Sequence, residues 1–191
     1  MIITLTGASG TGKTTVARRI LDEMPNSWML TSYTTRTQRP NDLYREYRYL
    51  TEDAFTALAD DDAFEWRTPP MRGKNYGTPR PLLKEAFDEP DVIRIMILVP
   101  ETMAKLYAYA DARGQRDAIR SFFIRSPAPD VLRKRLMEGR GLTEADVAID
   151  VARCHDWEVQ ARSSGLPYIY VEDTDDLDTK FEQIRSLAFS S

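Results

Sequence analysis

A glycine-rich segment near the start of the chain has the residue types and spacing of a phosphate-binding loop. Gly7-Ala8-Ser9-Gly10-Thr11-Gly12-Lys13-Thr14 fits the pattern G-x-x-x-x-G-K-[ST] at every fixed position. Glycines let successive backbone N–H groups converge on phosphate oxygens, and a following helix directs its positive end at them. We expect this segment and Thr15 to bind a nucleoside triphosphate, with Lys13 at the β and γ phosphates and the Thr14 hydroxyl on Mg²⁺.

The rest of the sequence narrows the use of that triphosphate. A GTPase would need a guanine-selecting motif of the kind [NT]-K-x-D, which this sequence does not contain. Many ATPases end an apolar strand in an acidic residue that holds the metal. Here the apolar stretch 95–99 is followed by Pro100-Glu101, and the stretch 119–124 is followed by Arg125. The remaining interpretation is a kinase that acts on a small phosphorylated acceptor.

A polar segment after the second expected strand carries arginines that could hold such an acceptor. Arg36 and Arg39 are three positions apart. Two guanidinium forks suit the anionic oxygens of a monophosphate, and each charge-assisted bond contributes about 1.5–3 kcal/mol. From the spacing alone, two solvated surface arginines are the simpler interpretation. The chain holds 20 arginines against 6 lysines, an excess that phosphate binding or genomic base composition would explain equally well.

Several further motifs follow the phosphate loop in a fixed order. They are Ser32 to Arg39 (S-x-T-T-R-x-x-R), Glu46-Tyr47-Arg48-Tyr49, Glu65-Trp66, Tyr76-Gly77-Thr78, Arg140-Gly141, and Tyr168 to Val171 leading to Asp173 and Asp176. With this series the chain resembles the guanylate kinase family, which transfers phosphate from ATP to GMP. The resemblance covers almost the whole chain.

The resemblance implies an acceptor site of seven side chains. Those expected at the acceptor's phosphate are Arg36, Arg39, Tyr47 and Tyr76. Those expected at the guanine edge are Ser32, Glu65 and Thr78. A carboxylate suits the N1–H and N2–H₂ donors of guanine and disfavours adenine, so Glu65 would select the base.

The resemblance also implies a mobile lid that completes the catalytic machinery. Arg140 and Arg153 would belong to this lid and, with Lys13, would neutralise charge as the γ-phosphoryl group moves. Arg135 could assist, although an arginine beside Lys134 on a helix could equally belong to a solvated face. No general base is expected, because the acceptor's nucleophile is already a phosphate oxyanion.

The sequence departs from the family pattern in four places. Residues 94–101 carry aliphatic side chains where the family has strand carboxylates, and the linker 40–45 lacks the usual G-E and G turn. The loop between Glu65 and Tyr76 and the segment between Arg140 and Arg153 are each about two residues longer than the pattern. These departures concern the identity of the acceptor more than the reaction.

The expected reaction is transfer of the γ-phosphoryl group of Mg-ATP to GMP or dGMP. Two alternatives remain open. The first is the same transfer to another phosphorylated acceptor, either another nucleotide or ribose 1,5-bisphosphate. The second is a non-catalytic guanylate-kinase-like binding module, which the intact Lys13 and Thr14 disfavour.

Strands and helices alternate along most of the sequence. Apolar stretches of strand length, at 2–6, 28–30, 91–99, 119–124 and 168–171, are separated by amphipathic stretches of helical period. This alternation predicts an α/β fold, the three-layer P-loop NTPase fold with a mainly parallel central sheet.

The predicted domain organisation follows from where the alternation is interrupted. Residues 1–30 and 92–191 would form the P-loop core, with the lid at about 138–156. The polar, strand-poor residues 31–91 would form an inserted acceptor-binding subdomain. Within it, the stretch 68–81 is rich in proline and glycine and is expected to be mostly loop.

The composition excludes several other classes of protein. A net charge of −4 argues against a protein that coats nucleic acid by bulk charge. One cysteine and one histidine leave little for a zinc site. No apolar run reaches the roughly 18–20 residues needed to span a bilayer, and no signal peptide is expected. We therefore expect a cytoplasmic monomer or homodimer whose partners are small-molecule nucleotides, without nucleic acid or membrane.

Overall fold

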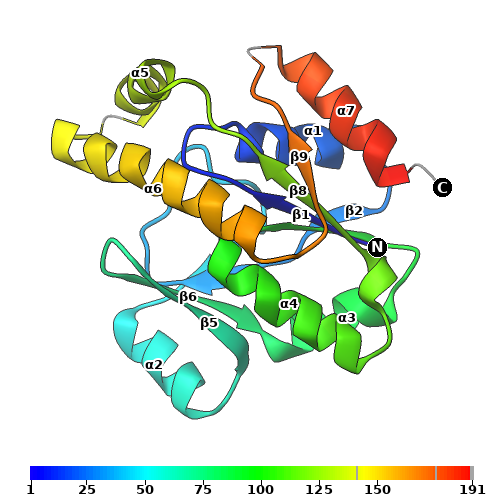
Figure 1. Ribbon diagram of the computed structural model, residues 1–191. Coiled ribbons are helices and arrows are strands. Elements are labelled where there is room, and N and C mark those ends of the chain that lie inside the picture. Colours follow the sequence, from blue (N-terminus) through cyan, green and yellow to red (C-terminus); the bar gives the residue numbers. More distant parts are fainter. Residues whose placement is uncertain (141, 175, 190–191) are drawn as a thin grey trace.

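A five-stranded parallel sheet forms the centre of the molecule (Figure 1). The computed structural model describes residues 1–140, 142–174 and 176–189. In the order β2-β7-β1-β8-β9, the strands are β2 (Ser27–Met29), β7 (Ile93–Ile97), β1 (Ile2–Thr6), β8 (Ile119–Ile124) and β9 (Tyr168–Val171). All pairs are parallel. The carboxyl ends of the strands therefore share one edge of the sheet, where ligands bind in open α/β folds.

Helices cover both faces of this sheet and bury two apolar cores. On one face lie α1 (Lys13–Glu23) and α7 (Leu177–Phe189), and on the other α3 (Arg80–Asp88), α4 (Pro100–Ala112) and α6 (Glu144–Ser163). Alternate residues of β1 face opposite cores, as the period of a strand requires. The expected α/β fold with a parallel central sheet is confirmed. None of the described helices has the length and apolar character to cross a membrane.

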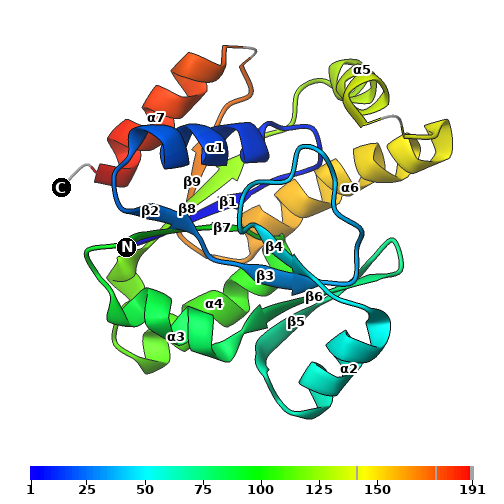
Figure 2. The same ribbon diagram turned by 180° about the vertical axis from the view of Figure 1, so that it is seen from behind.

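A second, mixed sheet lies beside the first and is formed by strands from one continuous part of the chain (Figure 2). In the order β4-β3-β6-β5, its strands are β4 (Tyr47–Tyr49), β3 (Ser32–Thr34), β6 (Lys74–Pro79) and β5 (Phe64–Met71). Helix α2 (Glu52–Asp60) is capped by the Thr51 hydroxyl, and its Phe55 stacks on Phe64 with ring centroids 4.8 Å apart. The helix thus closes one face of the second sheet.

The expectation of a mostly loop structure over 68–81 was wrong. Strands β5 and β6 form an antiparallel hairpin whose turn lies at Arg72 and Gly73. Helix α3 begins directly after β6. Pro69 and Pro70 are tolerated because β5 is an edge strand, where a missing N–H donor costs no ladder bond. The pairing shifts register between Thr68 and Met71, next to the two prolines.

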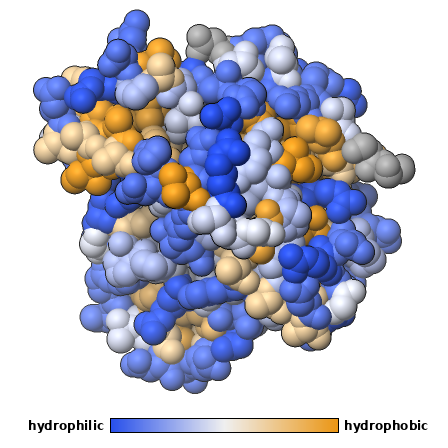
Figure 3. Space-filling model, in the orientation of Figure 1, coloured by the Kyte–Doolittle hydropathy of each residue, from blue (hydrophilic) through white to orange (hydrophobic). Residues whose placement is uncertain are grey.

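Helices α5 (Pro129–Arg140) and α6, which include most of the predicted lid, pack against each other at one end of the molecule. They share a small core of Leu132, Leu136 and Val147. A short 3-10 turn, η1 (Arg116–Ala118), precedes β8. Figure 3 shows apolar side chains gathered over α5 and the start of α6, where Val131, Met137 and Ile149 are exposed.

Candidate active site

The phosphate loop joins β1 to α1 at the carboxyl edge of the parallel sheet. Gly7 has φ +141°, and a Cβ built on it would lie 2.4 Å from the carbonyl oxygen of Ile124 in β8, so only glycine lets the loop pass this strand. The buried Thr11 hydroxyl donates to the Ala8 carbonyl at 3.0 Å and holds the curve of the loop. The loop therefore has a fixed shape around its centre.

Lys13 lies at the start of α1 and points its ammonium into the curve of the loop. Its Nζ donates to the carbonyls of Gly7 at 2.7 Å and Ala8 at 2.5 Å. Thr14 and Thr15 follow in the first turn of the helix. The residues 7–15 expected to bind a nucleotide are thus brought together at one helix N-terminus, the arrangement that suits phosphate.

A buried ion-pair network contacts the phosphate loop through Lys180, a residue that the sequence analysis did not identify. Lys180 of α7 is fully buried and donates to the Thr11 carbonyl at 3.3 Å and to Asp173 Oδ1 at 3.1 Å. Arg135 of α5 makes two bonds to the same carboxylate, at 3.1 and 3.2 Å. Arg135 is therefore engaged in an ion pair rather than belonging to a solvated face.

A cavity of about 200 Å³ opens between the loop and this network. Its lining comes from three places: the loop itself (10–12), Arg135, and the segment that leads into α7. Leu177 provides an apolar surface, whereas Arg135 and Lys180 provide charge. The cavity is adjacent to the place where the loop would hold phosphates.

In the segment between β3 and β4, Arg36 is buried and paired with Asp42. The two guanidinium nitrogens Nη1 and Nη2 each bond to a separate carboxylate oxygen at 2.9 Å, and Nη1 also donates to the Thr37 carbonyl at 2.8 Å. Burial raises the pKa of Asp42, but hydrogen bonds from Arg36, the Tyr49 hydroxyl and the Arg39 amide outweigh it and lower the pKa below its ordinary value. The pair is therefore ionised near neutral pH, and Asp42 fixes the orientation of the guanidinium.

Aromatic rings enclose the same arginine. The guanidinium carbon of Arg36 lies 4.8 Å from the ring centre of Tyr47 and 5.7 Å from that of Tyr49. Burial, followed by the charge of Glu46, raises the pKa of Tyr47 well above its ordinary value. The Tyr47 hydroxyl therefore remains protonated and can donate to an anion.

Two neighbouring threonines explain why the loop holds Arg36 at this place. Thr34 Oγ1 donates to the backbone carbonyl of Asn75 at 2.8 Å, and the backbone N–H of Asn75 donates to Thr35 Oγ1 at 3.0 Å. These bonds tie the end of β3 to β6. On β6, Gly77 is required because a Cβ would lie 2.6 Å from the Phe64 ring, which covers it.

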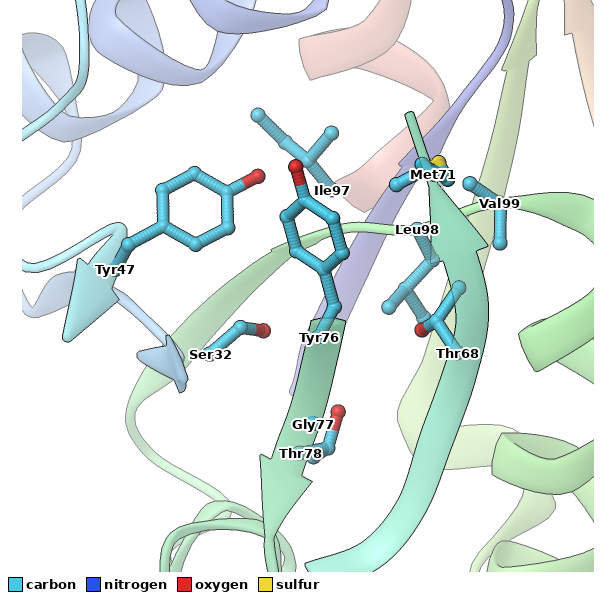
Figure 4. A pocket seen from close by; sticks show the side chains of 10 residues that line it. All are labelled: Ser32, Tyr47, Thr68, Met71, Tyr76, Gly77, Thr78, Ile97, Leu98 and Val99. Atoms are coloured by element: carbon cyan, nitrogen blue, oxygen red, sulfur yellow. The ribbon is translucent and has the colours of Figure 1, made fainter. Parts of the chain in front are cut away.

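A cavity of about 40 Å³ lies between the two sheets (Figure 4). Hydroxyl groups of Ser32, Tyr47, Thr68, Tyr76 and Thr78 line it, and the rings of Tyr47 and Tyr76 lie 6.0 Å apart. The rest of its wall is apolar and comes mainly from Met71 and the three residues 97–99. Four of the seven side chains expected in the acceptor site thus line one cavity, and Arg36 packs on one of them.

The other two expected acceptor residues lie elsewhere. Glu65 is paired with Arg80, whose Nη1 donates to Glu65 Oε2 at 2.8 Å, and its side chain is not among the ten that line the cavity. Arg39 is exposed, and the bond that fixes it comes from its backbone amide to Asp42 at 2.7 Å. Both residues stay predictions as acceptor contacts.

Of the two arginines predicted to belong to a lid, one side chain can be described. Arg153 lies on α6 with its guanidinium 5.8 Å from the Trp157 ring centre and 4.0 Å from Asp150 Oδ1. The side chain of Arg140, at the end of α5, lies outside the described residues. The buried acid Asp150 was missed, because an aspartate on an amphipathic helix gives no signal of burial in the sequence.

Taken together, the parallel sheet, the strand–loop–helix phosphate site and the second sheet define an α/β protein of the P-loop nucleotide-binding class. Residues 1–190 match the family described as guanylate kinase. The chain belongs to the guanylate kinase family.

Similarity to curated proteins extends over nearly the full chain. It is 33% identical over 189 residues to a guanylate kinase from Novosphingobium aromaticivorans, with 98% of this chain and 80% of that protein covered. A guanylate kinase from Maricaulis maris is 30% identical over 190 residues, with 98% and 81% covered.

Solved structures share the fold at lower sequence identity. A guanylate kinase from Anaplasma phagocytophilum superposes with a TM-score of 0.65 at 20% identity, covering 98% of this chain and 84% of that chain. A tunicamycin resistance protein from Deinococcus radiodurans superposes with a TM-score of 0.56 at 18% identity, covering 100% and 96%. At these identities the likeness concerns the fold alone.

Proposed function

We propose that this chain transfers the γ-phosphoryl group of Mg-ATP to GMP or dGMP. The observation that carries the proposal is the presence of two groups suited to bind anions, one beside each sheet. One is the phosphate loop with Lys13, and the other is the buried Arg36 with Tyr47 and Tyr76. In the proposal, residues 31–91 bind the acceptor and residues 138–156 act as the lid.

The donor would be held by the loop and by the cavity beside it. Successive N–H groups of residues 7–15 and the N-terminus of α1 would bind its phosphates, and the cavity next to Arg135 and Leu177 would take its nucleoside. The described residues hold no group of three or more His, Cys, Asp or Glu side chains suited to a metal. This fits Mg²⁺, which binds through substrate phosphates and few protein ligands, here the Thr14 hydroxyl. The ion would supply neutralisation of phosphate charge.

The acceptor would be held by its phosphate more firmly than by its base. The three bonds that Arg36 makes use three of the five guanidinium N–H groups, which leaves two for a phosphate oxygen. Tyr47 and Tyr76 would add hydroxyl donors. A cavity of 40 Å³ has room for a few water molecules, so a bound purine would need more space than the cavity has in this structure.

The transfer itself would need positioning rather than a base. A phosphate oxygen of the acceptor forms a bond to the γ-phosphorus, while the bond from that phosphorus to the β–γ bridging oxygen breaks and ADP leaves. Lys13 and the lid arginines would stabilise the charge on the moving group. Closure would keep water from accepting the phosphoryl group instead.

One observation favours a second candidate, the same transfer to a different phosphorylated acceptor. The cavity wall at Met71 and residues 97–99 is apolar, and Glu65 is paired with Arg80. Guanine presents donors that need acceptors, so an apolar wall lowers selectivity for it by about 1–3 kcal/mol for each missing contact. Another nucleotide or ribose 1,5-bisphosphate would be the acceptor in that case.

An ADP-release assay with Mg-ATP tests both candidates. The acceptors are GMP, dGMP, AMP, CMP, UMP, dTMP and ribose 1,5-bisphosphate, each compared by kcat/KM. We expect GMP and dGMP to exceed every other acceptor by at least about tenfold, the effect of one well-made polar contact. A preferred acceptor other than these overturns guanine selection, and no ADP release with any of them overturns the kinase assignment.

A further inference from the structure

The hairpin of the second sheet reaches across to the lid. Its turn places Arg72 at φ +51° beside Gly73 at φ +67°, and both ribbon views show it next to α6 (Figures 1 and 2). Arg72 Nη2 lies 2.8 Å from Asp150 Oδ2 and 3.5 Å from the Asp146 carbonyl. An ion pair thus joins the proposed acceptor side to the helix that carries Arg153.

Asp150 is placed between two arginines. Its side chain is 6% exposed, and while Oδ2 faces Arg72, Oδ1 lies 4.0 Å from Arg153 Nη1. The Arg153 guanidinium also lies over the Trp157 ring, 5.8 Å from its centre. A buried carboxylate and an aromatic ring together restrict the orientation of Arg153, which is otherwise a long side chain that is one-third exposed.

The two segments that meet here are two that the resemblance predicts to be about two residues longer than the family pattern. The stretch between Glu65 and Tyr76 supplies Arg72, and the stretch between Arg140 and Arg153 supplies Asp150. The contact between the hairpin and α6 therefore uses a residue from each of these segments.

We propose that Asp150 is a positioning residue for Arg153 and that Arg72 completes its position when the hairpin lies against α6. Removal of Arg72 leaves Asp150 free to turn, and removal of the Asp150 charge releases Arg153. Acceptor-side closure would in this way set the arginine that stabilises the moving phosphoryl group. This inference rests on the proposed kinase function, in which Arg153 acts in the transfer.

The test compares Asp150→Asn and Arg72→Gln with matched controls in the ADP-release assay. Asp156→Asn makes the same change at an exposed site of α6, and Arg67→Gln makes the same change at an exposed site of β5. We expect Asp150→Asn to lower kcat about tenfold with each KM within about twofold, because orientation of a group acts on the transition state. Arg72→Gln should lower kcat about threefold to fivefold, and both controls should match the parent.

Two further variants separate positioning from general support of the fold. The double variant Arg72→Gln with Asp150→Asn should be no slower than Asp150→Asn alone, because both act through one carboxylate. Arg72→Lys should recover most of the parental kcat, since an ammonium can still pair with Asp150. The melting temperature of every variant is measured and compared with the assay temperature. A loss of kcat that results from unfolding is recognised in this way.

Some outcomes overturn this inference alone, and one overturns the proposed function as well. Parental turnover with an unchanged kcat in Asp150→Asn, or independent multiplication of the two losses, overturns the inference alone. A loss of kcat that only follows the unfolded fraction also overturns it. A parent chain that releases no ADP with any acceptor overturns the proposed function and this inference with it.

Discussion

The phosphate loop and the acceptor site are assembled in contrasting ways. The loop is one continuous segment, and its glycines, its threonine and its lysine contact each other within a few positions. The proposed acceptor site is assembled from β3, β4, β5, β6 and the end of β7, and long-range bonds such as Thr34 to Asn75 hold β3 and β6 in place.

The contrast shows which of the two sites a sequence motif is sufficient to predict. A local segment carries its own geometry, so its motif is sufficient to predict its shape. A site built from separate strands depends on partners that no motif includes, of which Asp42 is the clearest, because it fixes the orientation of Arg36. Substitutions should therefore act on catalysis in the loop and on binding or selectivity in the acceptor site.

The largest effect is expected from Lys13→Ala. Loss of the ammonium that the loop holds should lower kcat by roughly 10²–10³-fold or more, the range measured for removal of one preorganised charge-stabilising donor. The fold should persist, because the loop keeps its glycines and the Thr11 bond. Circular dichroism and the ADP-release assay check both statements. Arg19→Ala on the exposed side of α1 is the control, and a Lys13→Ala chain with parental kcat would remove the loop from the mechanism.

A smaller effect is expected from Arg36→Ala, and it should appear in KM. Loss of one or two charge-assisted bonds to the acceptor's phosphate corresponds to about 1.5–3 kcal/mol, or roughly a 10- to 150-fold higher KM for the acceptor. The KM for ATP should stay within about twofold. Steady-state kinetics with each substrate varied gives both values.

The control for this variant is on the adjacent strand. Arg48 lies between Tyr47 and Tyr49 on β4 and stacks on Tyr33 instead, so Arg48→Ala removes the same charge from the opposite face of the strand. It should leave acceptor kinetics unchanged. Normal acceptor kinetics in Arg36→Ala would show that the acceptor's phosphate binds elsewhere.

A third and smaller effect tests base selection. Glu65→Gln exchanges a carboxylate for an amide of similar shape, so bonds to guanine N–H donors lose the contribution of the charge, about 1–1.5 kcal/mol or roughly 5- to 15-fold. The ratio of kcat/KM for GMP over AMP should fall by that factor, while the rate of transfer to bound acceptor changes little. An unchanged ratio would leave Glu65 as the partner of Arg80 alone. Asp62→Asn, which alters the other acidic partner of Arg80, is the matched control.

The sequence predicted the donor half of the molecule in detail and the acceptor half only in outline. The five parallel strands and the helix after the loop follow from apolar period and from the glycine motif. The hairpin at 64–79 was missed, because prolines mark a loop unless the strand is known to lie at an edge. Lys180 and Asp150 were missed because burial of a charged residue depends on partners far along the chain, Asp173 and Arg72 respectively.

The smallest expected effect concerns the buried acid Glu46, which lies between β3 and β4. Its burial should make the free energy of unfolding depend on pH. The side chain of Glu46 is buried, and its Oε2 accepts a bond from the Leu43 amide at 3.0 Å. Burial raises the pKa of Glu46 above its ordinary value of 4.5, and the bond from Leu43 opposes this without reversing it. The folded state thus binds this proton more tightly than the unfolded state. The stabilisation is complete below about pH 4.5 and is lost as the pH rises through the folded pKa.

Glu46→Gln isolates that contribution, because the amide oxygen can still accept the Leu43 bond but carries no titrating proton. Denaturant unfolding of both chains from pH 4 to pH 7 gives the difference in the free energy of unfolding at each pH. We expect the parent to lose stability relative to Glu46→Gln as the pH rises, and the difference to level off above the folded pKa. A constant difference, or one that moves in the parent's favour, would mean that Glu46 is not held in its protonated form by burial.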